Sequence, residues 1–107
     1  MSPQVKRSKP STAAVLRAIA HDDRIAVLKS FKTKGKEPVE LSAKMLSVRL
    51  DQPLSNVSYH VKALRNAGLL YTHRYEPRRG ARENFQRLTP LGTRALDLID
   101  QAEKVSR

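Results

Sequence analysis

Apolar positions recur along this chain with two different periods, and the change falls just after Gly68. Before Gly68 they return every three or four residues, the spacing of one helix face, and after it they follow the alternation typical of strands. The first pattern predicts helices over residues 12–20, 23–31, 43–50 and 56–67. The second predicts strands over residues 69–75 and 83–88, followed by a last helix over residues 90–103.

Residues that commonly begin and end helices stand at the borders of these segments. A hydroxyl or carboxylate before a helix accepts hydrogen bonds from the free backbone N–H groups of its first turn. The expected capping residues of this kind are Ser11, Asp22, Ser42 and Ser55. Thr89 followed by Pro90 predicts the start of the last helix, and Gly68 stands where a helix ends in the left-handed conformation.

Only a short turn separates the helices over 43–50 and 56–67, because Pro53 disfavours helix in the residue before it. Two short helices joined in this way form a helix-turn-helix, whose second helix can enter the major groove of DNA. A short strand over 39–41 precedes this pair and a β-hairpin follows it. The expected fold is therefore an α+β winged helix-turn-helix over residues 11–107, preceded by a flexible basic arm over residues 1–10.

The second helix of the motif divides into an apolar and a polar face. Val57, Val61 and Leu64 would pack inward, whereas the other face carries hydrogen-bonding groups and cations but no carboxylate that phosphates would repel. Serines near a helix N-terminus can donate to phosphates or bases, and a tyrosine ring can lie against a thymine methyl. The candidate DNA contacts on this helix are Ser55, Asn56, Ser58, Tyr59, Lys62, Arg65 and Asn66. The alternative is an ordinary solvated face.

The predicted hairpin has an arginine-rich turn over residues 76–82, where Gly80 permits a tight tip. Arginines on such a wing can enter a minor groove or lie on phosphates. The candidate wing contacts are Arg74, Arg78, Arg79 and Arg82. The alternative is a solvated basic turn.

Charge supports a polyanionic partner. The 107 residues contain 21 Lys and Arg against 10 Asp and Glu, a formal net charge of +11. A compact domain this basic repels itself, and DNA or RNA would relieve that cost. No long apolar run and no basic amphipathic helix indicates a membrane partner. The absence of cysteine excludes disulfides and thiolate metal ligands and fits a cytoplasmic protein.

The first and last helices are apolar over a wider arc than one small core covers. We therefore expect some of their side chains to stay partly in water in the single chain and to pack against a second copy. The expected dimer contacts are Val15, Leu16, Ile19, Leu96 and Ile99.

Three segments of the chain resemble the ArsR-type winged-helix repressors. Residues 18–28 resemble their opening, residues 54–70 their recognition helix and the glycine turn after it, and residues 85–92 the exit from their wing. The resemblance covers most of the chain from Thr12 onward. It implies a homodimer joined through the first and last helices. A small-molecule effector is left open as a further partner.

Metal sensing and catalysis are not expected. Metal-sensing members of that family often carry ligands on the third or the last helix, whereas here the third helix has none and the last has Asp97 and Asp100 without a histidine. His21 and His60 are interpreted as structural, and His73 stands alone on a strand. No histidine has an evident nucleophile partner and no glycine-rich phosphate loop is present, so no cofactor and no enzyme activity are predicted.

The sequence thus predicts a regulator that binds double-stranded DNA sequence-specifically. It would act as a homodimer on a palindromic operator, most simply as a repressor, and be nucleoid-associated in the cytoplasm. The alternative is a winged-helix interaction module of a larger complex, with a basic surface that binds RNA or an acidic protein. Large exposed aliphatic side chains on the outer face of the recognition helix would favour that alternative.

Overall fold

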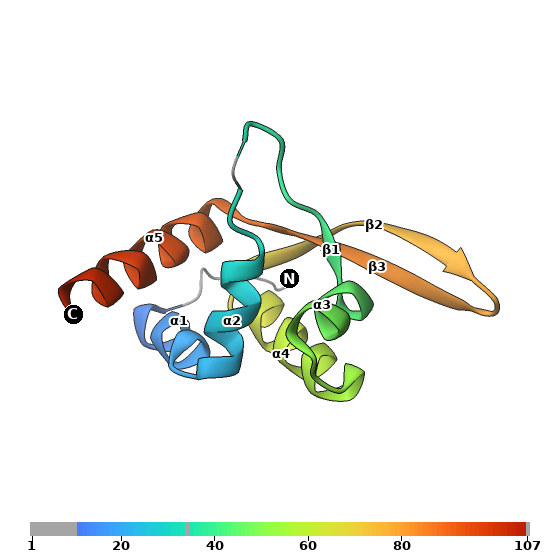
Figure 1. The fold of residues 1–107 in the computed structure, drawn as a ribbon, viewed down its shortest axis with the longest axis horizontal. Helices are drawn as coiled ribbons and strands as arrows, with labels where there is room; N and C mark the ends of the chain where they lie inside the picture. Colours follow the sequence, from blue (N-terminus) through green and yellow to red (C-terminus); the bar gives the residue numbers. More distant parts are fainter. Residues whose placement is uncertain (1–10, 34, 107) are drawn as a thin grey trace, which may run out of the picture.

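The computed structural model describes residues 11–33 and 35–106 and has the predicted α+β winged helix-turn-helix fold (Figure 1). In chain order its elements are α1 (Thr12–Ile19), α2 (Asp22–Ser30), β1 (Leu41–Ser42), α3 (Ala43–Leu50), α4 (Leu54–Asn66), β2 (Leu70–Arg78), β3 (Ala81–Leu88) and α5 (Pro90–Val105). The expected basic arm over residues 1–10 lies outside the described residues. No helix in the described ranges is long and apolar enough to cross a membrane.

Three helices begin as local chemistry predicts. The hydroxyl groups of Ser11, Ser42 and Thr89 accept hydrogen bonds from backbone N–H groups three residues further on, at 2.9–3.2 Å. Gly68 has φ +81°, the left-handed conformation expected after α4. Local signals therefore set these borders.

Two helix starts differ from the prediction. The cap of α2 is His21, whose Nδ1 accepts from the N–H of Asp23, while Asp22 lies in the first turn. The helix α4 begins after Pro53, whose carbonyl accepts from the N–H of Val57, and Ser55 lies inside the helix without capping it. Pro53 has φ −57° and ψ 140°, and α4 begins without a side-chain hydrogen bond at its cap.

The hairpin is longer than predicted. The expected turn over residues 76–82 is wrong, because Glu76 pairs with Glu83 and Arg78 with Ala81 as continuing strand. Only two residues form the turn, Arg79 and Gly80, and both have positive φ, a backbone twist that suits a two-residue hairpin. Proline at position 77 is tolerated because β2 is an edge strand of the sheet, whose order is β1-β3-β2.

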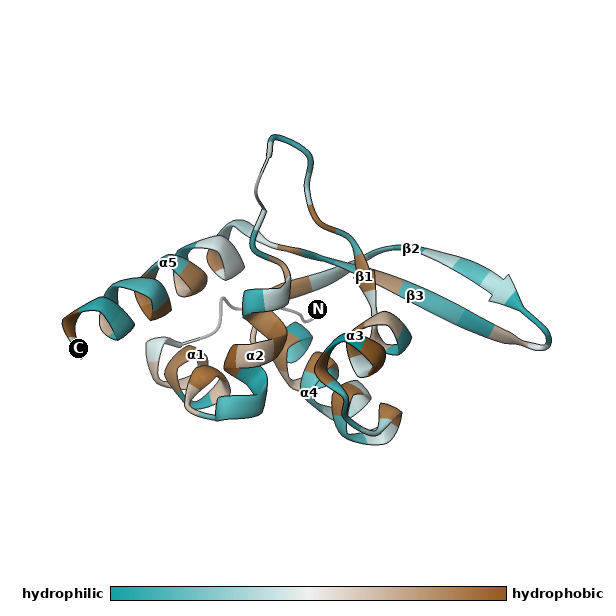
Figure 2. Cartoon of the chain, viewed as in Figure 1, coloured by the Kyte–Doolittle hydropathy of each residue, from teal (hydrophilic) through white to brown (hydrophobic). Residues whose placement is uncertain are grey.

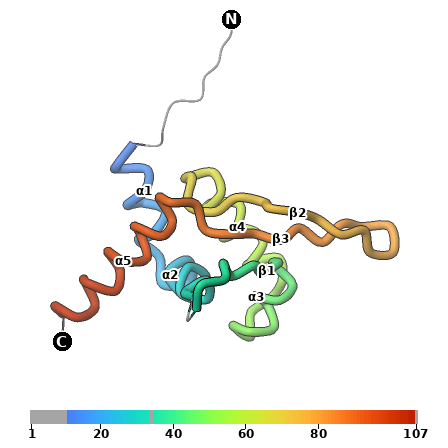
Figure 3. The backbone as a smooth tube through the Cα atoms, turned by 90° about the horizontal axis from the view of Figure 1, so that it is seen from above, coloured from blue at the N-terminus to red at the C-terminus, as the bar shows by residue number. Residues whose placement is uncertain are grey.

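The sheet has a third strand only at the base of the hairpin. A strand is expected over 39–41, but β1 consists of Leu41 and Ser42, which pair with Gln86 and Phe85 of β3, and residues 39 and 40 lie outside it. Beyond Phe85 the hairpin extends away from the helices as a wing without a third strand (Figures 1 and 3). The wing is largely hydrophilic, whereas apolar residues are concentrated on the helices (Figure 2).

The apolar core is formed by residues from all five helices and from the base of the sheet. Leu28, Leu46, Val57, Leu64 and Leu69 are fully buried there. The start of α5 packs against the turn after α4 so closely that a Cβ on Gly92 would lie 2.1 Å from the carbonyl oxygen of Leu69. Two ion pairs join α5 to α2 and its following loop, Lys29 with Glu103 at 2.6 Å and Lys32 with Asp100 at 3.0 Å.

Burial corrects one expectation about the first and last helices. Ile19, Leu96 and Ile99 do not stay partly in water in the single chain, because they are 5–8% exposed and belong to its own core. Val15 is half-buried, and Leu16 is 48% exposed. A helical wheel measures the width of an apolar arc but not which part of it the chain itself covers. The dimer contact of these residues stays a prediction.

Candidate nucleic-acid interface

The helix α4 presents its two faces as its sequence predicts. Val57, Val61 and Leu64 are buried against the neighbouring helices, and His60 is buried beside them. All seven candidate DNA contacts are exposed, namely Ser55, Asn56, Ser58, Tyr59, Lys62, Arg65 and Asn66. The polar face of α4 is therefore free to contact a partner.

The same helix shares an open cleft of about 730 Å³ with the wing. Ser58 and Arg65 of α4 line it from one side, and Arg79, Arg82 and Glu83 of the hairpin line it from the other. The fold thus joins the predicted recognition helix and the predicted wing in one surface.

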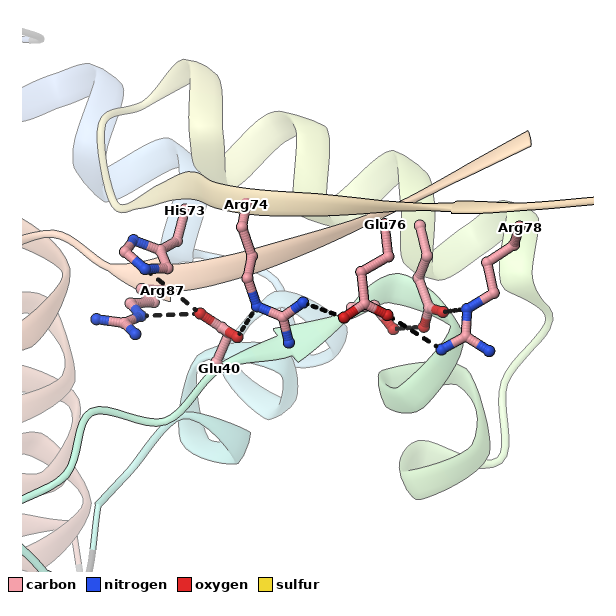
Figure 4. Close-up of polar contacts among 8 residues, drawn as sticks. Glu40, His73, Arg74, Glu76, Arg78 and Arg87 are labelled. Carbon is pink, nitrogen blue, oxygen red and sulfur yellow. Dashed lines mark hydrogen bonds and ion pairs between the residues drawn. The ribbon is translucent and has the colours of Figure 1, made fainter. Parts of the chain in front are cut away.

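Two of the four candidate wing arginines are held in ion pairs with carboxylates (Figure 4). Arg74 binds Glu40 at 2.6 Å through Nε and also binds Glu76. Arg78 binds Glu76 at 3.3 Å and Glu83 at 3.1 Å. These contacts form one chain of alternating charges along the wing, here called the wing ion-pair chain, from Glu40 through Arg74, Glu76 and Arg78 to Glu83.

Glu40 anchors this chain at the base of the wing. Its carboxylate also pairs with Arg87 Nε at 3.1 Å and lies 3.8 Å from His73 Nε2. Burial acts to raise the pKa of Glu40, but the hydrogen bonds and charges of Arg74 and Arg87 outweigh it and hold this pKa below its ordinary value. The hydrogen bonds to Glu40 and Glu76, with the charges of these carboxylates, raise the pKa of Arg74. Both groups are therefore charged at neutral pH.

The other two wing arginines are exposed and have no ion pair within the described ranges. Arg79 occupies the turn at the tip of the wing. Arg82 lies over the ring of Tyr75, with its guanidinium carbon 4.6 Å from the ring centroid, and this contact does not neutralise its charge. Their charges remain available to a phosphate.

Arg65 of α4 is positioned by side chains of the sheet. Its guanidinium donates to Thr72 Oγ1 at 3.5 Å, and Thr72 is bonded in turn to the buried amide of Gln86 at 3.0 Å. Arg65 also lines the cleft between α4 and the wing.

His21, Asp23 and His60 form the one group of three potential metal ligands in the described ranges, with ligand atoms within 4.8 Å of one another. Both imidazoles accept a hydrogen bond at Nδ1, His21 from the N–H of Asp23 and His60 from Arg24 Nε. A neutral imidazole that accepts at Nδ1 carries its proton on Nε2. Two protonated Nε2 atoms beside a guanidinium suit a hydrogen-bond network better than a cation, so we do not assign a metal to it.

Sequence reasoning missed the acidic members of the wing. Glu76 and Glu83 stand beside the arginines in the sequence, and this was the available signal, since opposite charges near a hairpin turn can pair across strands. Glu40 carried no such signal, because its partner Arg74 is 34 residues away. Because Glu40, Glu76 and Glu83 pair with Arg74 and Arg78, the wing is less uniformly cationic than its arginines alone suggest.

Comparison with known proteins agrees with this geometry. Residues 8–72, more than half of the chain, match the family model described as a helix-turn-helix domain. The structure of reduced HlyU from Vibrio cholerae N16961 matches with a TM-score of 0.64 and 27% identity, over 84% of this chain and 85% of that chain. A comparison with curated proteins gives no match.

Two further solved structures share the fold at lower identity. A possible transcriptional regulatory protein from Mycobacterium bovis (fragment 1–100) has a TM-score of 0.66 and 20% identity, over 86% of this chain and 89% of that chain. The transcriptional regulator HlyU from Vibrio vulnificus CMCP6 has a TM-score of 0.60 and 21% identity, over 84% of each chain. The chain therefore belongs to the helix-turn-helix domain family and is a DNA-binding transcriptional regulator of the winged-helix type.

Proposed function

We propose that the protein is an ArsR-type repressor that binds a roughly palindromic operator as a homodimer. The observation that carries this proposal is the continuous surface formed by the polar face of α4 and the cationic wing around one cleft. The recognition helix would enter the major groove, and the wing would follow the adjoining backbone or minor groove.

The side chains of α4 divide by chemistry into two roles in this proposal. Ser58 and Tyr59 are the candidates for base contacts, because a hydroxyl can bond to base edges and an exposed ring can lie against a thymine methyl. Tyr59 is 63% exposed, so its ring is free for such a contact. Ser55, Asn56, Lys62, Arg65 and Asn66 would contact phosphates or flanking bases.

Within the wing, Arg79 and Arg82 are the stronger candidates for phosphate contacts. Arg74 and Arg78 are already paired with carboxylates, so a phosphate would have to compete with Glu40, Glu76 or Glu83. Exchange of one carboxylate for a phosphate gains little, whereas an unpaired arginine releases a counterion from DNA. We therefore propose that Arg79 and Arg82 contact phosphates directly, and that Arg74 and Arg78 act indirectly through their carboxylate partners.

The dimer is proposed at the end of the molecule opposite the wing tip, where α1 and α5 lie in both views (Figures 1 and 3). Three large apolar side chains are exposed on these helices: Leu16 by 48%, Leu98 by 50% and Val105 by 85%. A second copy packed on them about a twofold axis would remove this surface from water. Two recognition helices would then meet half-sites about 10–10.5 base pairs apart, or a multiple of that spacing.

The outer face of α4 does not favour the alternative of an interaction module. Its exposed large hydrophobic residues are Tyr59 and, at the first helical position, Leu54. A protein-docking helix would expose several large aliphatic groups there.

Control by a small-molecule effector and a place on the chromosome in the cytoplasm are further parts of the proposal.

Three measurements test the proposal. Duplexes that the protein binds are selected from a random-sequence pool, and the protein's footprint on them is mapped at single-base resolution. A mobility-shift titration then compares the affinity for the selected duplex with the affinity for RNA of the same sequence. We expect two protected half-sites with twofold symmetry and preference for duplex DNA over RNA of the same sequence. Equal affinity for RNA, or a single unsymmetrical half-site bound by one chain, would contradict the proposal.

A further inference from the structure

Building on the proposed DNA binding, we propose that Glu83 is a positioning residue that clasps the wing to the start of α3, so that operator binding depends on a carboxylate inside the cationic cleft. Pure electrostatics would predict the reverse, because a carboxylate repels the phosphates that this cleft is proposed to receive. Removal of Glu83 should weaken DNA binding if the residue positions the wing, and strengthen it if only charge repulsion matters, so the two can be distinguished.

One oxygen of Glu83 connects the wing to the helix-turn-helix. Glu83 Oε2 accepts a hydrogen bond of 2.5 Å from Ser42 Oγ, and the same hydroxyl accepts from the N–H of Met45 at 3.2 Å as the cap of α3. A serine hydroxyl can donate one hydrogen bond, and Ser42 donates it to Glu83. Ser42 is 1% exposed, so its position is set by the core.

The other oxygen of Glu83 holds the wing itself. Glu83 Oε1 lies 3.1 Å from Arg78 Nε, and Arg78 continues the wing ion-pair chain to Glu76. The side chain of Glu83 is only 14% exposed, and hydrogen bonds to charged groups strengthen where water is excluded. One carboxylate thus joins two adjacent parts of the surface, the tip half of the wing and the cap of α3.

Between Glu83 and its tip, the wing has little backbone pairing outside its own two strands. The strand β1 pairs with β3 only through Leu41 and Ser42, and beyond that point the hairpin is two-stranded. A two-stranded hairpin is marginally stable by itself and its direction is set at its base. The clasp lies beyond the last residue of β3 that pairs with β1, and it therefore limits how the tip can swing relative to α4.

This restraint bears on binding because Arg79 and Arg82 line the cleft opposite Ser58 and Arg65. A phosphate backbone seated between these groups would require a fixed separation of wing and recognition helix. If the wing swings, part of the binding free energy goes into ordering it. The proposed benefit of Glu83 is this preorganisation, which exceeds the repulsion of its charge.

Two variants separate charge from position. Glu83→Asp keeps the charge but withdraws the carboxylate by one methylene from Ser42, whereas Glu83→Gln keeps the length and removes the charge that holds Arg78. Glu37→Gln is the matched control, because it removes the same charge from an exposed position in the loop before β1. Thermal unfolding followed by circular dichroism checks that each variant is folded.

The probe is a duplex selected from a random-sequence pool by the unaltered protein, at several salt concentrations. We expect Glu83→Asp and Glu83→Gln each to bind it about 10-fold more weakly, which corresponds to the upper end of the contribution of one ordinary hydrogen bond. The salt slope of Glu83→Asp should be unchanged, because this variant keeps the charge beside Arg78 and loses no phosphate contact. Glu37→Gln should bind equally or slightly more tightly. Binding by Glu83→Gln that is as tight as that of Glu37→Gln would overturn the proposal.

Amide hydrogen exchange in the free protein gives a second measurement, which does not depend on DNA. Amides of residues 76–82 should exchange faster in Glu83→Asp than in the unaltered protein, while those of α4 should not change. Equal exchange in both proteins would overturn the clasp. Failure of the unaltered protein to bind any duplex would instead overturn the proposed function, and the exchange result would still decide the role of Glu83.

Discussion

Arg24 Nε donates a hydrogen bond of 3.3 Å to Nδ1 of His60 and so connects α2 to the buried side of the recognition helix. The guanidinium of Arg24 also lies 5.7 Å from the ring centroid of Tyr59, the neighbouring residue on the exposed side. Burial first, and then the charges of His21 and Arg24, lower the pKa of His60 below its ordinary value of 6.5, against the opposite effect of Asp23. The folded state therefore holds His60 neutral.

This contact predicts a loss of stability in mild acid. The pKa of His60 is lower in the folded than in the unfolded chain, so the unfolded chain takes up the extra proton. The contribution of neutral His60 is fully present above pH 6.5 and declines as the pH falls from there toward the lower folded value. Urea unfolding at pH 8, 7, 6 and 5 measures this decline.

His60→Gln should flatten this pH dependence, because glutamine cannot be protonated but can still accept from Arg24. The unaltered protein over the same pH series is the comparison. A decline of the same size in His60→Gln would assign the effect to other groups.

Replacement of Tyr59 by alanine is expected to reduce discrimination between operator and random duplex. Its ring is exposed, so the fold should be unaffected, and loss of one base contact costs roughly 1–3 kcal/mol of discrimination. Lys62→Ala is the comparison, because a phosphate contact weakens binding to both duplexes alike. Equal losses on both duplexes with Tyr59→Ala would remove its proposed base-reading role.

The two groups of wing arginines are expected to differ in salt dependence. Arg79→Gln and Arg82→Gln should each reduce the slope of log affinity against log salt by about 0.9, because each removes one phosphate contact. Arg17→Gln, an exposed change on α1 at the opposite end of the molecule, should leave the slope unchanged. The division of the wing would be wrong if Arg74→Gln reduced the slope as much as Arg79→Gln.

A charge on the exposed apolar face of α5 should separate the proposed dimer. Leu98→Glu leaves the core intact, since Leu98 is 50% exposed, and it would place a carboxylate in the interface. Light scattering at micromolar concentration should then give the 12.1 kDa monomer, against a dimer for the unaltered protein. Val48→Glu, an exposed apolar position on α3, is the control and should stay dimeric. A monomeric unaltered protein would contradict the interface.

Gly92→Ala should destabilise the fold, because the new Cβ would meet the carbonyl oxygen of Leu69 at 2.1 Å. Backbone on both sides of this contact must move, and overpacking of this kind costs about 1–3 kcal/mol. Gly35→Ala is the control, since its Cβ would meet no atom within 4 Å. Denaturant unfolding compares the two, and equal midpoints would show that α5 can shift without cost.

Local interactions explain why much of the fold could be predicted from the sequence. The caps at Ser11, Ser42 and Thr89 act over three residues, and the left-handed Gly68 ends a helix that its own periodicity defines. The hairpin was predicted too short, because cross-strand pairs such as Glu76 with Glu83 bring together residues whose separation depends on the turn. A turn of two residues or of seven fits the same arginine-rich segment.

The sequence by itself determined the order of helices and strands, the cationic balance and the polar face of α4, because helix periodicity, caps and net charge depend on neighbouring residues or on composition. Only the tertiary structure decided which arginines are paired, since Glu40 reaches Arg74 from 34 residues away. It also decided that Leu96 packs inside its own chain while Leu98 faces outward. Both outcomes depend on which segments far apart in the sequence pack against each other, and a local sequence pattern contains no information about that packing.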